Sequence, residues 1–182
     1  MSDFPVTGIP PLPTIHTWSY ECLGVPLTGM ALLLSAQASA TYPTANLAIY
    51  LPFGLATIIK VTKLWWYSGA TLSGNVDVGI YDSAGRRLIS TGSTAQAGTA
   101  SRVQAVDVTD TMIGPGDFYL AIAASATTVT LFRIALGNAL FGKAFGILQQ
   151  ATAFPLPATA TFATTAQTFV PEFGLLHGRA FL

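Results

Sequence analysis

Alternating apolar and polar residues in the middle of the chain predict β-structure. In residues 75–81, NVDVGIY, valine or isoleucine occupies every second position and polar or small residues lie between them. This period of two is typical of a strand with one buried face. Asp82 and Gly85 then bracket a tight turn, because Asp favours the first position of a β-turn and Gly the last. Residues 86–91 are predicted to return as the partner strand.

Further apolar runs, separated by turn residues, predict strands on both sides of this hairpin. They lie at residues 47–53, 57–67, 102–108, 117–124 and 129–134, and the terminal run of 169–182 is a candidate last strand. Roughly six to eight short strands with frequent turn signals are typical of two packed antiparallel sheets. We therefore predict an all-β fold, an antiparallel and jelly-roll-like β-sandwich.

The strand predicted at residues 57–67, TIIKVTKLWWY, is apolar on both of its faces. Strict alternation divides its large side chains into two sets, Ile59, Val61 and Trp65 on one face and Ile58, Leu64 and Trp66 on the other. Exposure of so many large apolar groups would favour aggregation. We therefore expect both faces to be covered, one by the core and the other by an arm or a neighbouring subunit.

Prolines distinguish the N-terminal segment from the rest of the chain. Residues 1–26 contain five prolines, which lack the N–H group that helices and central strands use. We predict an extended N-terminal arm over residues 1–26 and a β-sandwich domain over residues 27–182, whose core spans 44–134. The arm either docks on a neighbouring subunit or packs on its own domain. Its apolar anchors would be Ile9, Leu12, Ile15 and Trp18.

The C-terminal part, residues 135–182, is predicted to be an irregular interface segment. Residues 135–150 read ALGNALFGKAFGILQQ, and their glycines argue against a stable helix. Pro155 and Pro157 then force the residues before them into extended conformations. We expect this segment to contact neighbouring subunits through Leu140, Phe141, Phe145, Phe154 and Leu156.

The charge content favours self-association and gives no reason to expect nucleic acid as a partner. Only 9% of the residues are charged, and eight basic and eight acidic side chains cancel. An average soluble domain carries about 25% charged residues. The chain therefore lacks both a basic patch for nucleic acid or acidic membranes and the repulsion that keeps copies apart. We expect a homo-oligomer, with a trimer as the first choice; the alternative is a compact, Ala/Thr-rich monomer.

Membrane, secretory and disulfide features are also not predicted. The apolar runs are too short or too interrupted for a spanning helix, which needs roughly 18 apolar residues. The first residues, MSDFPVTG, show neither the basic start nor the apolar run of a signal peptide. A single cysteine, Cys22, excludes an intrachain disulfide and suits a reducing cytoplasm.

A metal site would have to draw on His16, Glu21, Cys22 and His177, which include the only histidines and the only cysteine. No two of these residues have the spacing of zinc ligands, and a C-x-x-C pair is missing. We expect no bound metal, and we interpret the two histidines as surface or interface residues.

The core region contains five aspartates, and none is predicted to be catalytic: Asp77, Asp82, Asp107, Asp110 and Asp117. Asp82, Asp110 and Asp117 adjoin predicted turns, where Asp hydrogen-bonds its own backbone. A glycosidase pair and a calcium site are the alternatives, but no run resembles an EF-hand loop. The chain also lacks a G-x-S-x-G elbow, a P-loop and a G-x-G-x-x-G loop, so we expect neither enzymatic activity nor a cofactor.

Three tryptophans, Trp18, Trp65 and Trp66, are candidates for a platform on which a sugar would stack. Adjacent residues of a strand point to opposite faces, so Trp65 and Trp66 cannot line the same site. We expect at least one of them to belong to the core.

Several stretches resemble accessory virion proteins of tailed bacteriophages, which are described as minor structural, head-decoration or tail-fibre proteins. The stretches are SGNVDVGIYDSAGRRLISTGSTAQAG, DVTDTMIGPGDFYLAIA, FPLPATATF and FVPEFGL, and the similarity spans roughly residues 44–175. The resemblance implies a non-enzymatic β-sandwich that is present in many copies and forms oligomers.

Sequence and resemblance together suggest a capsid decoration (cement) protein. We expect it to be assembled in the host cytoplasm and located in the virion, with copies of itself and the major capsid protein as partners. The alternative is a tail-fibre or receptor-binding module that recognises a glycan on the host surface.

Overall fold

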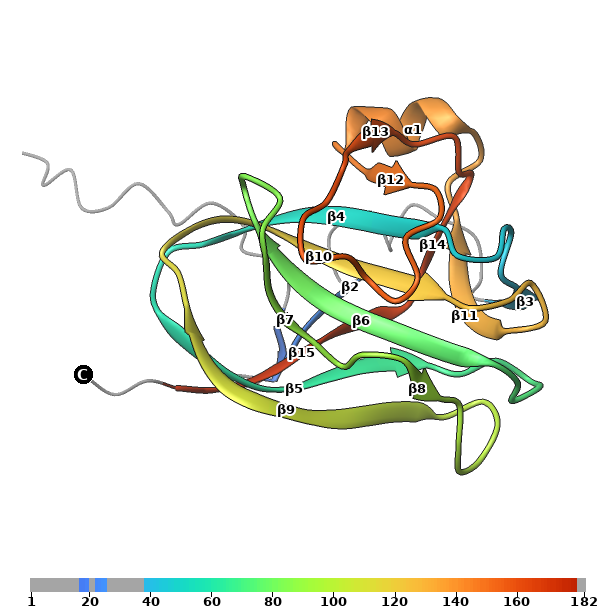
Figure 1. Ribbon diagram of the computed structural model, residues 1–182, viewed down its shortest axis with the longest axis horizontal. Helices are drawn as coiled ribbons and strands as arrows, with labels where there is room; N and C mark the ends of the chain where they lie inside the picture. Colours follow the sequence, from blue (N-terminus) through green and yellow to red (C-terminus); the bar gives the residue numbers. More distant parts are fainter. Residues whose placement is uncertain (1–16, 20–21, 26–37, 180–182) are drawn as a thin grey trace, which may run out of the picture.

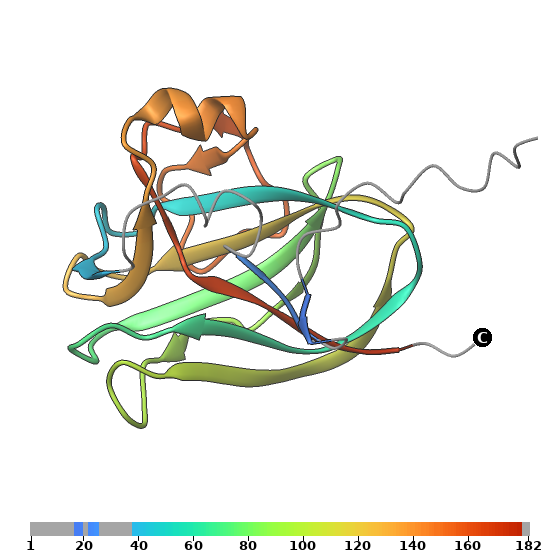
Figure 2. The same cartoon turned by 180° about the vertical axis from the view of Figure 1, so that it is seen from behind.

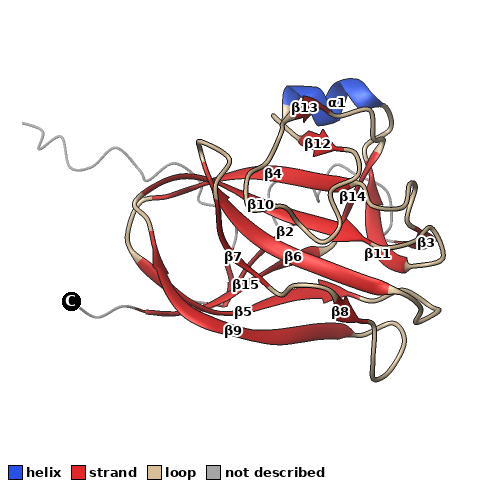
Figure 3. Ribbon diagram, viewed as in Figure 1, coloured by secondary structure: helices blue, strands red, loops and turns tan. Residues whose placement is uncertain are grey.

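The computed structural model describes residues 17–19, 22–25 and 38–179 of the chain. Within these residues the protein consists of three antiparallel sheets and one short helix (Figure 1). Figure 3 shows how strongly strands dominate, with the helix at one end of the molecule. The prediction of an all-β, antiparallel fold is confirmed, whereas the jelly-roll connectivity stays a prediction.

The two larger sheets form the body of the fold. The five-stranded sheet runs in the order β1 (Thr17–Ser19), β2 (Cys22–Val25), β15 (Phe173–Arg179), β5 (Ile59–Tyr67) and β9 (Val103–Ile113). The path of the seven-stranded sheet is β13 (Ala163–Thr164), β12 (Leu148–Gln150), β4 (Ala48–Leu55), β10 (Gly116–Ala124), β6 (Asn75–Asp82) and β7 (Arg87–Ser90). Its remaining strand, β8 (Thr94–Ala95), also pairs with β6.

A smaller sheet and the helix complete the structure. The three-stranded sheet runs β14 (Phe169–Pro171), β11 (Thr130–Ala135) and β3 (Ala38–Thr41). Helix α1 (Ala139–Ala144) follows β11 in the chain. Figure 2 shows from behind that β15, near the C-terminus, lies between β2 and β5. The predicted last strand is therefore an interior strand of its sheet.

The main core lies between the inner faces of the two larger sheets. Apolar side chains of β6 and β10 enter it from one side, namely Val76, Val78, Ile80, Leu120 and Ile122. Those of β5 and β15 enter from the other side, namely Leu64, Trp66, Phe173 and Leu175. The inward face predicted from the alternation of residues 75–81 is thus confirmed.

A β-bulge in β5 alters the faces predicted for this strand. Ile59 and Val61 share the main core with Leu64 and Trp66, although strict alternation places them on opposite faces. The pairing with both neighbouring strands shifts between Val61 and Lys63. The extra residue reverses the phase of the alternation. The expectation that both faces are covered is confirmed, since Trp65 is 8% exposed and Trp66 is 0% exposed.

A segment that we call the strap, residues 151–162, covers the outer face of the seven-stranded sheet. Figure 1 shows it crossing in front of β4, β10 and β6. Ala153 and Leu156 of the strap are buried in a second apolar cluster with Tyr50 and Tyr81 of the sheet. The outer face of β6 is therefore buried as well, and the prediction that this strand has one buried face is wrong.

Helix α1 corrects the prediction that residues 135–150 are irregular. Two of the glycines lie outside the helix, Gly137 before it and Gly146 after it, both with positive φ. The third, Gly142, is inside the helix and buried, and a Cβ there would lie 2.9 Å from Cγ2 of Thr165. The glycines therefore delimit the helix and let it pack closely.

The predicted N-terminal arm is described only in part. Ile9, Leu12 and Ile15 lie outside the described residues, and Trp18 is a residue of β1 whose side chain is not described. Strand β2 pairs with β15, so residues 22–25 belong to the five-stranded sheet. The division into an arm and a domain stays a prediction.

Candidate interaction surface

Helix α1 carries three large apolar side chains on the protein surface. Leu140 is 72% exposed, Phe141 is 49% exposed and Phe145, the C-cap residue, is 43% exposed. We call these three residues the α1 patch. Lys143 is the only charged residue in the helix.

The local structure of α1 directs its large side chains outward. The side-chain oxygen of Asn138 accepts hydrogen bonds from the backbone N–H groups of Leu140 (2.9 Å) and Phe141 (3.3 Å). This N-cap satisfies two of the donors that the first helical turn leaves unpaired. The buried position of the helix is occupied by Gly142. The helix therefore packs through its smallest residue and exposes its largest ones, the reverse of an ordinary surface helix.

The predicted contact residues of the C-terminal segment fall into two groups. Leu140, Phe141 and Phe145 are exposed, so they are available for contacts, and their interface role stays a prediction. Leu156 is 1% exposed and belongs to the cluster beneath the strap, where Phe154 also packs, half-buried. The prediction that Leu156 contacts a neighbouring subunit is wrong, because its side chain is enclosed by its own domain.

Sequence reasoning missed the structural importance of Asp77. Its side chain is completely buried on the outer face of β6. Oδ1 accepts hydrogen bonds from the hydroxyls of Ser90 (2.8 Å) and Thr91 (3.2 Å), and Oδ2 accepts one from the backbone N–H of Leu156 (2.9 Å). Burial raises the pKa of Asp77, and these donors and the nearby Arg87 offset part of the rise. The sequence feature that could have revealed this role is the position of Asp77 between Val76 and Val78, inside a predicted strand.

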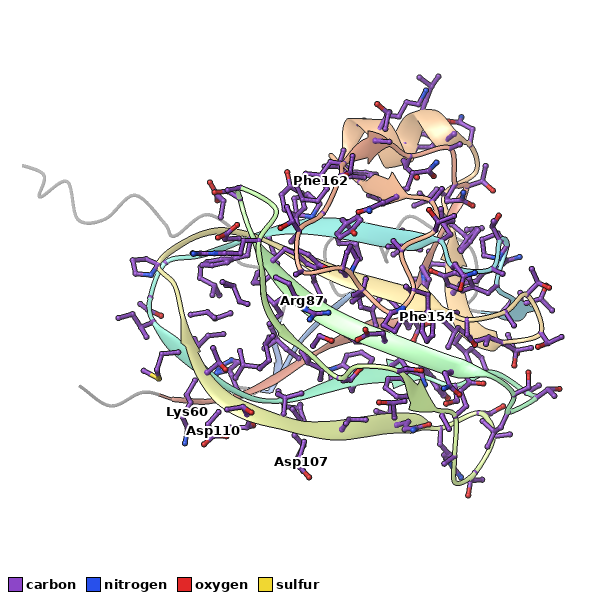
Figure 4. All side chains as sticks on the ribbon, in the orientation of Figure 1. Lys60, Arg87, Asp107, Asp110, Phe154 and Phe162 are labelled. Atoms are coloured by element: carbon purple, nitrogen blue, oxygen red, sulfur yellow. The ribbon has the colours of Figure 1, made fainter. Side chains whose placement is uncertain are left out.

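The four other aspartates of the core region lie at the surface or in turns. Asp82 closes the predicted turn, since its side chain accepts a hydrogen bond from the N–H of Arg86 (2.8 Å). Asp107 and Asp110 lie within β9 and form ion pairs with Lys63 (2.6 Å) and Lys60 (2.9 Å) of β5, as Figure 4 shows for Lys60 and Asp110. The turn role expected of Asp110 is therefore wrong, because β9 extends to Ile113. Asp117 lies at the start of β10, directly after the short connection from β9, as expected of a residue beside a turn.

A second buried carboxyl group belongs to Glu172, between β14 and β15. Its side chain is 4% exposed, and Oε1 has no hydrogen-bond partner in the described part of the chain. Removal from water raises the pKa of Glu172 from 4.5 to about 7. Sequence reasoning could not predict this burial, because it depends on the packing of distant segments.

The sugar platform and the metal site considered from the sequence find little support in the geometry. Trp65 and Trp66 are both buried, so neither presents a ring face on which a sugar could stack. In the described residues no three His, Cys, Asp or Glu side chains gather as a potential metal-ligand set. His177 is buried, and His16 and Glu21 lie outside the described residues.

No helix in the described part of the chain has the length and apolar character needed to cross a membrane. Comparison with protein-family models, curated proteins and solved structures found no match. The surfaces of the molecule therefore provide the structural ground for a proposed function.

Proposed function

We propose that this chain is a non-enzymatic structural protein of a phage particle that holds neighbouring subunits together by burying apolar surface. The observation that carries the proposal is the α1 patch, in which a capped helix exposes one leucine and two phenylalanines. Apolar side chains gathered at one exposed site mark protein contacts, whereas isolated ones need no explanation. Aromatic residues are also enriched at the centres of interfaces.

The size of the α1 patch indicates its role within a larger contact. Full burial of a Leu or Phe side chain contributes roughly 1.5–3 kcal/mol, so completing the burial of three half-exposed ones contributes on the order of 3–4 kcal/mol. The association of two proteins costs at least about 4 kcal/mol in lost translational and rotational freedom. The α1 patch therefore serves as a hot spot in an interface to which other surfaces also contribute.

The proposed partners are further copies of this chain, as a trimer, and the major capsid protein. Net charge zero and a charged fraction of 9% support close packing of identical copies, since like copies do not repel one another. The resemblance to accessory virion proteins supports a place on the capsid as a decoration protein. Asp77 is enclosed and hydrogen-bonded within its own domain, so its carboxylate is not available to a substrate.

The test is to image intact phage particles that carry the wild-type protein or its variants. We expect many copies over the capsid surface, and loss of that density for Leu140→Ser/Phe141→Ser. Met112→Ser is the matched control, because Met112 is also an exposed large apolar residue (51%) but lies on β9. Absence of the protein from purified particles, or full attachment of the double variant, would overturn the proposal.

A further inference from the structure

A groove of about 710 Å³ lies along the seam where the two larger sheets approach each other. It is lined by residues of β7 and the loop after it, by Thr109 and Thr111 of β9, and by Pro155 of the strap. Its volume falls within the range of about 300–1,000 Å³ that is typical of small-molecule sites. The groove is separate from the α1 patch, since the two share no residues.

The lining of the groove contains side-chain hydroxyl groups, which can both donate and accept hydrogen bonds. Ser90, Thr91 and Ser93 line one wall, and the two threonines of β9 line the other. Within the described residues β7 pairs only with β6, and β9 pairs only with β5, so both are edge strands. Edge strands present backbone N–H and C=O groups that have no partner in the sheet. Such a lining matches a ligand with many hydroxyl groups, each of which both donates and accepts.

Arg87 is the one charged side chain among the described residues that line the groove. One of its N–H groups donates to the carbonyl oxygen of Leu156, which fixes the guanidinium beside the strap (Figure 4). A guanidinium has five donors in a rigid fork, which matches the two oxygens of a carboxylate. The nearby Asp77 is engaged with Ser90, Thr91 and the backbone of Leu156. The groove therefore contains one positively charged group, the guanidinium of Arg87, beside a wall of serine and threonine side chains.

We propose that this groove binds a carboxylated saccharide, such as a uronic acid unit of a surface polysaccharide. Arg87 would pair with the carboxylate, while Ser93, Thr109 and the strand edges would bond the sugar hydroxyls. No aromatic side chain is among the described lining residues, so the sugar ring has no stacking partner. We expect weak binding at each single site, with a Kd of about 1 mM. Many copies on one particle would raise the overall affinity for a polysaccharide.

The test is a titration of the folded, isotope-labelled protein, followed by amide NMR, with tri-galacturonate and with the neutral tri-galactoside as probes. We expect shifts confined to residues 87–93 and 109–111, and affinity for the acidic sugar about tenfold higher than for the neutral one. Equal affinity for both sugars, or no binding of either, would overturn the proposal. So would equal shifts with acetate alone, because they would show a simple anion site.

Two arginine variants form a matched pair for this experiment. Arg87→Gln should reduce affinity for the acidic sugar about tenfold, since it removes a charged hydrogen bond. Arg86→Gln should leave affinity unchanged, because Arg86 lies outside the groove and pairs with Asp82. Thr109→Trp places a bulky ring at an exposed position on the β9 side of the groove and should abolish binding. Undiminished binding by a folded Arg87→Gln protein, or by Thr109→Trp, would contradict the assignment.

Discussion

The carboxylate of Asp77 accepts a hydrogen bond of 2.9 Å from the backbone N–H of Leu156, 79 positions further along the chain. Two more hydrogen bonds connect the strap to the same sheet. The hydroxyl of Tyr81 donates to the carbonyl of Pro157 (2.6 Å), and the backbone N–H of Arg87 donates to the carbonyl of Ala158 (2.9 Å). The strap is thus tied to β6 and β7 at three successive residues.

Asp77→Ala should destabilise the fold by about 3 kcal/mol. It removes the acceptor for Leu156, Ser90 and Thr91 together, and a buried donor without a partner costs roughly 1–3 kcal/mol. Asp77→Asn keeps one acceptor oxygen and should cost less. Chemical denaturation measures both changes. Asp117→Ala, at an exposed aspartate, is the control and should stay within about 0.5 kcal/mol of wild type; an equal loss from both alanine variants would contradict this account.

Stability should fall as pH rises from about 4.5 to about 7, because of Glu172. Its pKa is raised to about 7 in the folded protein, so the folded state holds the proton more tightly than the unfolded state. The stabilisation is complete below the unfolded pKa and is lost as pH rises through the folded pKa, by on the order of 2–3 kcal/mol. Asp77 contributes with the same sign, because burial raises its pKa too.

Thermal unfolding of Glu172→Gln across this pH range checks the assignment. The variant should show a flatter profile and should be more stable than wild type at pH 8, since its side chain carries no charge to bury. Asp110→Asn, which alters an exposed ion pair, should leave the slope unchanged. A wild-type profile in the Glu172→Gln protein would show that another group is responsible.

Asn138→Ala should loosen α1 without unfolding the sandwich. Loss of an N-cap costs about 1 kcal/mol, and here that cost falls on a six-residue helix outside the main core. Hydrogen exchange should become faster at the amides of Leu140 and Phe141, which the Asn138 side chain binds. Amides of β10 serve as an internal control and should exchange as in wild type. Unchanged exchange at both capped amides would show that the cap is dispensable.

Local alternation was enough to predict the inner faces of the main strands. In β6 and β10 each inward residue is two positions from the next, so adjacent sequence carries the whole signal. In β5 the same rule failed beyond Val61, because the bulge depends on pairing with β9 and β15. The burial of the outer face of β6 could not be predicted from neighbouring residues either. The strap that covers it lies more than 70 positions later in the chain.

The candidate surface was predictable to a similar extent. The sequence singled out Leu140, Phe141 and Phe145 as apolar residues with no place in a strand, and the structure leaves them exposed. It did not reveal that Gly137 and Gly146 flank a helix, because a cap such as Asn138 competes with glycine's low helix propensity. Leu156 looked equivalent to these residues in the sequence, but it is buried in the cluster beneath the strap and its backbone N–H is bonded to the distant Asp77.

Sedimentation velocity of the purified protein tests most directly whether the α1 patch drives assembly. The comparison is wild type against Leu140→Ser/Phe141→Ser/Phe145→Ser, with Met112→Ser as control. We predict oligomers for wild type and for Met112→Ser, and monomers for the triple variant with an unchanged thermal unfolding midpoint. Oligomers of the same size in the triple variant, or a wild-type protein that stays monomeric at all concentrations, would contradict the account.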